Sequence, residues 1–461
     1  MRPPRLTPEA LRQALRDLPI ASAAELAQRL QVSQPTVSRG LAALGEGVVR
    51  IGRTRAARYA LSRSVDRLGA SWPLHTIDAD GRPHTVGRLH ALQGSAWYFD
   101  SGAQHPYWLR GEFSQGLFPD LPWFLEDLRP QGFLGRAFAQ QYAEELDAPA
   151  DLGLWHGDHV LTALLRHGHN LPGRMVLGDA MLERALQEII RPPNVVDVSD
   201  RADSYLQRAE AALQGQPVGS SAGGEQPKFT AVLREADGEY RGTVIKFSEP
   251  GESVAAIRWA DLLYCEHLAG TVLQSAGIAA AATEIIDAGG RRFLQSTRFD
   301  RSAELGRRGY LSLRALATAY LGRARAPWVE MADLLLAQGW LSGPGAETLR
   351  CLGLFGEMIG NSDMHFGNLA FEFADHTPFK LLPVFDMLPM LYAPGSTGAV
   401  IERRFEPPVP LPRYQHAWQT ATTLAVQFWS AVSADAAISA PFRTIAAANG
   451  DKVARLLQRF G

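Results

Sequence analysis

The alternation of hydrophobic and polar positions predicts three helices and two strands in the first 67 residues. Apolar residues at helical spacing indicate a helix over residues 6–18. Ser22-Ala-Ala-Glu25 has the form of a capping box that opens a second helix, and Ser33 is expected to cap a third. Strands are expected over residues 48–51 and 57–61. This order is typical of a winged helix-turn-helix domain, whose third helix enters the major groove of DNA.

Charge favours a nucleic-acid partner for this segment. Residues 1–67 carry 12 Arg and 5 acidic residues, a net charge of +7, whereas the remainder carries 34 basic and 43 acidic residues, a net charge of −9. The side chains predicted to contact DNA are Gln34, Thr36, Ser38 and Arg39 of the third helix and Arg53, Arg55 and Arg58 of the wing. The alternative is a small helical interaction domain that binds no DNA.

The pattern over residues 68–210 is less informative. Its apolar segments are interrupted by Pro and Gly, which is typical of an architectural domain, and Arg191-Pro-Pro-Asn194 indicates a connection to the next one. A polar cluster comprises His156, Asp158, His159, His167 and His169. Its spacing matches no closed zinc set, so hydrogen-bonded loop histidines are the preferred interpretation over a metal site.

The pattern changes again at residue 219. A loop of small residues leads into alternating strands over residues 229–234 and 240–247, then a long helix over 253–276, and then a hairpin over 283–286 and 293–299. Two strands, a helix and two further strands follow the order of a kinase N-lobe. The rest of the chain is predicted to be largely helical, with helices at about 310–323, 328–340, 345–359 and 412–434.

Lysine usage points to candidate phosphate ligands in this region. Only four of the 46 basic residues are Lys, namely Lys228, Lys246, Lys380 and Lys452. Lysine is a compact point charge suited to phosphate, and arginine does not replace it freely at such a site. Lys246 on the second strand is therefore the candidate for the ATP phosphates. Glu266 on the long helix is its candidate orienting partner, although an exposed helical glutamate is an equally good interpretation.

Three polar residues in the helical half fit phosphoryl transfer. The segment Asn361-Ser-Asp-Met-His-Phe-Gly-Asn368 places Asp363 five positions before Asn368, and Asp386 follows a predicted strand pair over 369–373 and 379–384. Kinases use a carboxylate to accept the substrate proton, and an amide and a second carboxylate to hold Mg²⁺. A capped turn and a loop carboxylate are the alternative interpretation.

Composition limits the remaining choices. The chain has 461 residues, of which 46% are hydrophobic and 20% charged, as in ordinary globular proteins. No apolar run approaches the roughly 18 residues of a membrane span. Its two cysteines cannot make a disulfide framework. A cytoplasmic location without a membrane partner is expected.

Together these motifs resemble the HipA-type serine/threonine kinases, toxin components of bacterial toxin–antitoxin systems. The basic N-terminal segment makes the chain similar to the YjjJ-like branch, with a fused winged helix-turn-helix. The matching segments are Ser221-Ala-Gly-Gly-Glu-Gln-Pro-Lys228, Val244-Ile-Lys246-Phe, Arg298-Phe-Asp-Arg301, Asn361-Ser-Asp-Met-His-Phe-Gly-Asn368 and Val384-Phe-Asp386-Met.

The resemblance implies roles for individual residues. Asp363 would be the catalytic base, and Asn368 and Asp386 would be the Mg²⁺ ligands. Lys246 would be the ATP-phosphate lysine. From the residues alone, Gly223, Gly224, Lys228 and Glu266 complete the expected ATP-binding set, and a flexible linker is the alternative interpretation of the glycine loop. Family members phosphorylate a serine of their own glycine loop and so inactivate themselves, and here Ser221 matches that serine, with Ser220 beside it.

The expected fold class is α+β, a bilobal protein-kinase-like (HipA-like) fold with an N-terminal winged-helix DNA-binding domain. The expected domains are 1–67, the winged helix-turn-helix; 68–210, a HipA-like N-terminal subdomain; 211–305, a kinase-like N-lobe; and 306–461, a helical C-lobe.

The expected function is an ATP- and Mg²⁺-dependent serine/threonine protein kinase of HipA toxin type. DNA, a protein substrate, an antitoxin and a second copy of the chain are its candidate partners. Two alternatives stay open. One is a DNA-binding transcription regulator whose kinase-like body only senses nucleotide or ligand, and the other is a small-molecule phosphotransferase.

Overall fold

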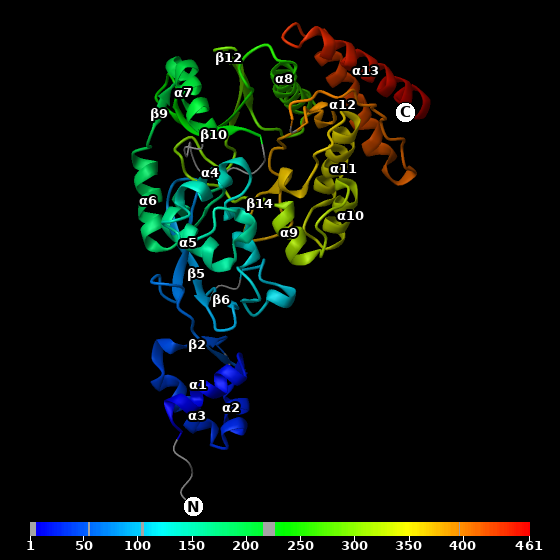
Figure 1. Cartoon of the computed structure of the whole chain (residues 1–461). Helices are drawn as coiled ribbons and strands as arrows, with labels where there is room; N and C mark the ends of the chain where they lie inside the picture. Colours follow the sequence, from blue (N-terminus) through cyan, green and yellow to red (C-terminus); the bar gives the residue numbers. More distant parts are fainter. Residues whose placement is uncertain (1–5, 54–55, 103–105, 215–225, 396) are drawn as a thin grey trace, which may run out of the picture.

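The N-terminal residues form a small head joined to a much larger body in the computed structural model (Figure 1). The structure describes all residues except 1–5, 54–55, 103–105, 215–225 and 396. The head contains α1 (Pro8–Asp17), α2 (Ala23–Leu30), α3 (Gln34–Ala43) and an antiparallel sheet in the order β1 (Ala21–Ser22), β3 (Arg58–Leu61), β2 (Val48–Ile51). The helices and strands predicted from the sequence are therefore present.

Capping explains where the second and third helices of the head begin. Ser22 Oγ accepts a hydrogen bond from Glu25 N (3.2 Å), and Glu25 Oε2 accepts one from Ser22 N (2.7 Å), which completes the predicted capping box. Ser33 stands at the N-cap of α3, but its hydroxyl pairs with Thr36 Oγ1 (2.8 Å) and makes no cap hydrogen bond. The prediction that Ser33 caps this helix is wrong in that respect.

Residues after the head form a first antiparallel sheet with three helices. The strand order is β7 (Leu117–Phe118), β6 (Trp97–Asp100), β5 (Pro83–Ala91), β4 (Ser71–Ile77), β8 (Met175–Leu177), and the helices are α4 (Gly132–Tyr142), α5 (Gly157–His167) and α6 (Asp179–Ile190).

The head packs directly on this first sheet. Val49 and Ile51 of β2 share a small buried cluster with Leu92 and Tyr98. Arg63 donates two hydrogen bonds to the Asp158 carboxylate, at 2.5 and 2.9 Å. Apolar packing and a bidentate ion pair thus hold the head against the body.

A second five-stranded sheet follows the first. Its order is β12 (Thr283–Ala288), β13 (Arg291–Thr297), β11 (Tyr240–Phe247), β10 (Lys228–Arg234), β9 (Val195–Asp197). The first strand of this sheet in the sequence, β9, pairs in parallel with β10, and α7 (Arg201–Leu213) contacts both. These elements begin before residue 210, and they pack with the strands that follow it. The division of the chain at residue 210 stays a prediction.

The two faces of this sheet are covered by different helices. Tyr205 and Ala209 of α7 pack with Phe229, Ile245 and Phe247 in one buried cluster. Side chains alternate along a strand, so Lys246 points to the opposite face. The long helix α8 (Val254–Ser275) covers that face and carries Glu266.

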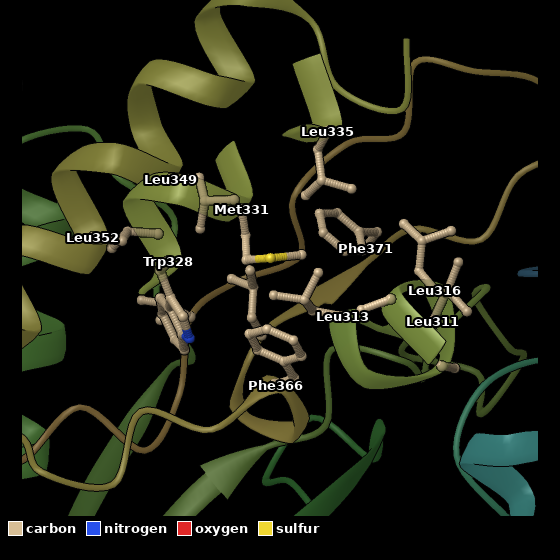
Figure 2. Packing of buried hydrophobic residues seen from close by; sticks show 14 of the residues in the cluster. Leu311, Leu313, Leu316, Trp328, Met331, Leu335, Leu349, Leu352, Phe366 and Phe371 are labelled. Carbon is tan, nitrogen blue, oxygen red and sulfur yellow. The ribbon is translucent and has the colours of Figure 1, made fainter. Parts of the chain in front are cut away.

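The last part of the chain is a helical bundle. It contains α9 (Leu313–Tyr320), α10 (Trp328–Ala337), α11 (Gly343–Met358), α12 (Gln415–Ala434) and α13 (Ala440–Phe460). Helix α13 was not predicted from the sequence. Figure 2 shows that Phe366 and Phe371, from the segment after α11, point into the same apolar cluster as Leu313 and Met331.

The segment between Asn368 and Asp386 is less regular than expected. Only β15 (Ala370–Phe371) is a strand there, and it pairs with β14 (Leu311–Ser312). An isolated bridge joins Phe371 to Leu381, so the two halves do run antiparallel. Val384 then exchanges backbone hydrogen bonds with residues 279 and 281 (3.0 and 2.9 Å), which brings Asp386 beside the second sheet.

No helix in the part of the chain that the structure describes is both long and apolar enough to span a bilayer.

Candidate active site

The loop that carries Asp363 begins at a glycine just after the end of α11. Gly360 has φ +72°, and Asn361 N donates to Gly356 O (2.8 Å), as at a helix end closed by a left-handed residue. Asp363 follows in an exposed position, whereas Phe366 is buried in the helical core. The buried ring anchors the loop and leaves the carboxylate of Asp363 facing solvent.

Asn361 ties two loops of the candidate site together. Its Oδ1 accepts from Asp363 N (3.1 Å), and its Nδ2 donates to Asp386 O (3.1 Å). Asn368 adds a further link, because its Nδ2 donates to Asp363 O (3.0 Å). The sequence offered a capped turn at Asn361-Ser-Asp363 as an alternative interpretation, and the hydrogen bond from Asp363 N to Asn361 Oδ1 forms such a turn. The link from Asn361 to Asp386 was not predicted.

Lys246, Glu266 and Asp386 meet at the junction of the second sheet and the helical bundle. Lys246 Nζ lies 2.7 Å from each carboxylate oxygen of Glu266 and also donates to Asp386 Oδ1. The Glu266 carboxylate accepts a third hydrogen bond, from Asp386 N to Oε1 (3.2 Å). Glu266 is only 6% exposed, so the interpretation of it as an exposed helical glutamate is wrong.

Charge balance sets the ionisation of this cluster. Burial opposes the charge on Lys246, but the adjacent Asp386 and Glu266 carboxylates raise its pKa overall. Burial likewise opposes the charge on Asp386, yet Lys246 and Lys228 lower its pKa. Burial raises the pKa of Glu266, and the repulsion of Asp386 adds to this effect. The ammonium group and the Asp386 carboxylate are therefore the charges that the cluster holds most firmly.

The described part of the predicted glycine loop ends at Lys228. Lys228 begins β10 directly opposite Lys246 and is 3% exposed, which places both lysines on the face of the sheet that α8 covers. The predicted loop residues Ser220, Ser221, Gly223 and Gly224 lie outside the described residues.

Comparison with known proteins gives the family. The chain is 36% identical over 444 residues to "Toxin YjjJ" of Escherichia coli (strain K12), covering 95% of this chain and 96% of that protein. This chain belongs to the YjjJ-like toxin family. Residues 68–186 match the family description "YjjJ-like toxin, middle domain", and residues 220–449 match "HipA-like C-terminal domain".

Two solved structures show more distant likenesses to this YjjJ-like chain. One is HipA of Shewanella oneidensis MR-1, in a complex with HipB and operator DNA, at 15% identity and a TM-score of 0.49, over 84% of this chain and 97% of that one. The other is the Helicobacter pylori proinflammatory kinase CtkA, at 12% identity and a TM-score of 0.37, over 53% and 92%. Family membership rests on the sequence matches.

The YjjJ-like chain carries oxygen ligands that suit Mg²⁺. Asn368 uses the nitrogen of its amide for Asp363, which turns its oxygen the other way, and Asp386 gives one oxygen to Lys246. Mg²⁺ prefers oxygen ligands and is often held by one or two side chains together with substrate phosphates. The Asn368 amide oxygen and the second Asp386 oxygen fit that pattern.

The members of the histidine cluster make local contacts. Within the described residues, no group of three or more His, Cys, Asp or Glu is placed to hold a metal ion. The members instead have local partners: His167 with Glu145 and His169 with Glu188 (both 3.1 Å), while His156 and His159 stack at 3.8 Å between ring centroids. The preference for hydrogen-bonded histidines over a metal site agrees with these contacts.

The predicted DNA-contact residues differ in their exposure. On α3, Gln34, Ser38 and Arg39 are exposed, and Thr36 is partly buried. Arg58 is exposed on β3. Arg53 is also exposed but lies 3.7 Å from Asp100 of the body, so it faces the first sheet; Arg55 is outside the described residues.

Proposed function

We propose that this YjjJ-like chain is an ATP- and Mg²⁺-dependent protein serine/threonine kinase with a fused DNA-binding head. The observation that carries the proposal is the interlocked cluster of Lys246, Glu266 and Asp386 beside the exposed Asp363. Kinase catalysis requires a paired lysine and glutamate, a metal-binding carboxylate and a proton acceptor at one junction. The HipA-like match over residues 220–449 spans all four residues.

The side chains divide the work of phosphoryl transfer. Lys246, fixed by Glu266, contacts the nucleotide phosphates, and Asp363 accepts the proton of the attacking hydroxyl. Asn368 and Asp386 offer their oxygens to Mg²⁺, which neutralises phosphate charge when it is bound. The hydrogen bonds of Asn361 keep the Asp363 loop and the Asp386 loop at a fixed spacing.

A direct test uses purified protein, radiolabelled ATP and a cell lysate, with and without Mg²⁺. Labelled protein bands are expected only with Mg²⁺, and Asp363→Ala should abolish them without changing thermal unfolding, because Asp363 is exposed. Equal labelling by the variant would overturn the assignment of Asp363. Nucleotide binding without any labelling would instead favour a regulator that only senses nucleotide.

Self-inactivation is part of the same proposal. The motif at residues 221–228 supports phosphorylation of Ser221 or Ser220. After incubation with ATP, peptide mapping should find phosphate in residues 219–228, and the Ser220→Ala/Ser221→Ala double variant should stay active for longer. A map without phosphate in this peptide contradicts this part of the proposal alone.

The head is proposed to be a winged helix that binds DNA. Its three helices and β2–β3 hairpin have the required order, its net charge is positive, and Gln34, Ser38 and Arg39 are exposed on α3. A protein substrate, an antitoxin and a second copy of the chain are the further proposed partners.

A further inference from the structure

A cavity of about 680 Å³ lies between the second sheet and the helices that precede it. Residues of α5, α6, α7, β10 and the segment 298–307 line it. None of Lys246, Asp363, Asn368 or Asp386 is among its lining residues. Its volume is within the roughly 300–1,000 Å³ of small-molecule sites. The proposed kinase site therefore does not account for this cavity.

Positive charge dominates the wall of the cavity. Its lining arginines are Arg184, Arg208, Arg298, Arg301 and Arg307, whereas Glu188 is the only acidic residue among the described lining residues. Asp300, just behind the wall, accepts hydrogen bonds from Arg298 (3.0 and 2.8 Å) and Arg301 (2.7 Å). One carboxylate is thus shared by two arginines, which leaves an excess of positive charge in the wall.

Arg307 is the unusual member of this set. It is 3% exposed, and one of its nitrogens donates to His169 O. Its Nε and Nη1 atoms are buried without a hydrogen-bond partner among the described residues, as is Nδ1 of His169. Burial, together with the repulsion of Arg298, lowers the pKa of Arg307 to about 10. Buried charged donors normally have partners, so these atoms indicate a missing anion.

Aromatic rings line another part of the same cavity. Tyr142 lies 4.2 Å from His167 and 4.9 Å from Phe138, measured between ring centroids, and all three rings are partly buried. Flat rings provide stacking surfaces for a nucleobase, and guanidinium groups bind phosphate through charge-assisted hydrogen bonds. Both features within one cavity favour a ligand that has a planar base and an anionic phosphate.

We propose that this cavity binds a nucleotide, with a phosphate on Arg307 and the base against Tyr142 and His167. This site is distinct from the proposed ATP site, and the inference does not depend on kinase activity. It predicts two nucleotide sites in each chain if both proposals hold, and one if the kinase proposal fails.

Equilibrium dialysis with radiolabelled ADP and GDP in the presence of Mg²⁺ tests the proposal. Four proteins are compared: wild type, Lys246→Met, Arg307→Gln and the double variant. Lys246→Met should retain one site that binds at least one of the two nucleotides. Adding Arg307→Gln should weaken that remaining site by about tenfold or more, because a charged donor to phosphate is lost. Arg307→Gln alone leaves any site that depends on Lys246 in place, so the two proposals fail separately.

Matched variants separate binding from misfolding. Glutamine at position 307 keeps a donor for His169 O, and Tyr142→Ala removes the ring without changing the arginines. Both should weaken binding in the Lys246→Met protein while its thermal unfolding remains cooperative. Arg403→Gln, at an exposed position away from the cavity, should leave binding unchanged. In the Lys246→Met protein, nucleotide binding left unaltered by both Arg307→Gln and Tyr142→Ala would overturn the proposal. Binding of labelled pyrophosphate without any binding of ADP or GDP would also overturn it.

Discussion

The charged residues of the body and those of the head are arranged in opposite ways. In the body, Lys246, Glu266 and Asp386 are packed together away from solvent, and Asp300 is held between Arg298 and Arg301. In the head, Arg39 of α3 and Arg58 of β3 are exposed to solvent. The electrostatic interaction between buried charged groups is strong, because little solvent or salt screens it. Exposed charged groups interact with a polyanion across solvent, where dissolved salt screens the interaction. The first arrangement suits chemistry on one bound molecule, and the second suits a duplex.

Lys246→Met should give the largest effect, because it removes the cation of the buried cluster. The rate of phosphate transfer to protein is expected to fall at least about 10²-fold, the usual cost of losing one fixed charge at a reacting group. Initial rates with radiolabelled ATP measure this. Lys452→Met is the matched control, since that amine donates to Phe405 O outside the candidate site. If Lys452→Met lowers the rate of phosphate transfer as much as Lys246→Met does, the loss is not specific to the buried cluster.

The same substitution should destabilise the fold. Without Lys246, the carboxylates of Glu266 and Asp386 face each other with no cation between them, so the free energy of unfolding should fall by about 3–5 kcal/mol. Urea denaturation measures the loss. Adding Glu266→Gln should recover part of it, because one of the two carboxylates is then neutral. If the double variant is no more stable than Lys246→Met, charge is not what holds the cluster.

The buried carboxylate of Asp300 should make the free energy of unfolding fall at acidic pH. Burial opposes its ionisation, but Arg298 and Arg301 lower its pKa overall. A lowered pKa in the folded state means that this carboxylate stabilises the fold above its unfolded pKa of about 4, and that the contribution is lost as the pH falls below it. Unfolding free energies between pH 6 and 3 should therefore decline less steeply in Asp300→Asn than in wild type.

The head supplies the control for that pH series. Asp17 also has a lowered pKa, through hydrogen bonds from Arg29 and Gln13, but it lies on the surface. Asp17→Asn should follow the wild-type curve closely. If Asp17→Asn flattens the curve as much as Asp300→Asn does, burial is not the property that separates the two regions.

The smallest expected effect is on DNA binding. Arg39→Ala should weaken binding to a labelled duplex a few-fold and reduce the slope of log affinity against log salt by about one, as for the loss of one phosphate contact. Fluorescence anisotropy over a range of salt concentrations measures both quantities. Arg12→Ala, on α1, should change neither. Equal slopes for wild type and Arg39→Ala would contradict the assignment of α3 to the groove.

Local patterns in the sequence predicted the three helices of the head, α8 to α12, the capping box and Lys246, because these features depend on residues close together in the chain. Lys246 was also marked by the scarcity of lysine. Long-range partners decided the rest. Strand β15 pairs with β14, about 60 residues earlier, and β9 pairs with β10, which follows α7 in the chain. No local pattern contains such pairings.

In the candidate site, too, local sequence predicted some features and distant partners determined others. Its ionisable members were recognisable by residue type and order, but whether Glu266 is exposed or buried depends on how α8 lies on the sheet. The role of Asn361 requires the carbonyl of Asp386, 25 residues away. The hydroxyl of Ser33 was expected to accept a hydrogen bond from a backbone N–H of α3, but it pairs with the hydroxyl of Thr36 instead. Each of these outcomes depends on a competing partner.

The contact between head and body has a geometric consequence. Because Val49 and Ile51 are buried against Tyr98, and Arg63 is clamped to Asp158, the two parts cannot pivot freely. If α3 binds a DNA duplex, the body of the protein would therefore have a fixed orientation relative to the axis of the DNA. Neighbouring copies would then collide or interlock according to how many base pairs separate them, so the spacing of binding sites would itself select which assemblies can form.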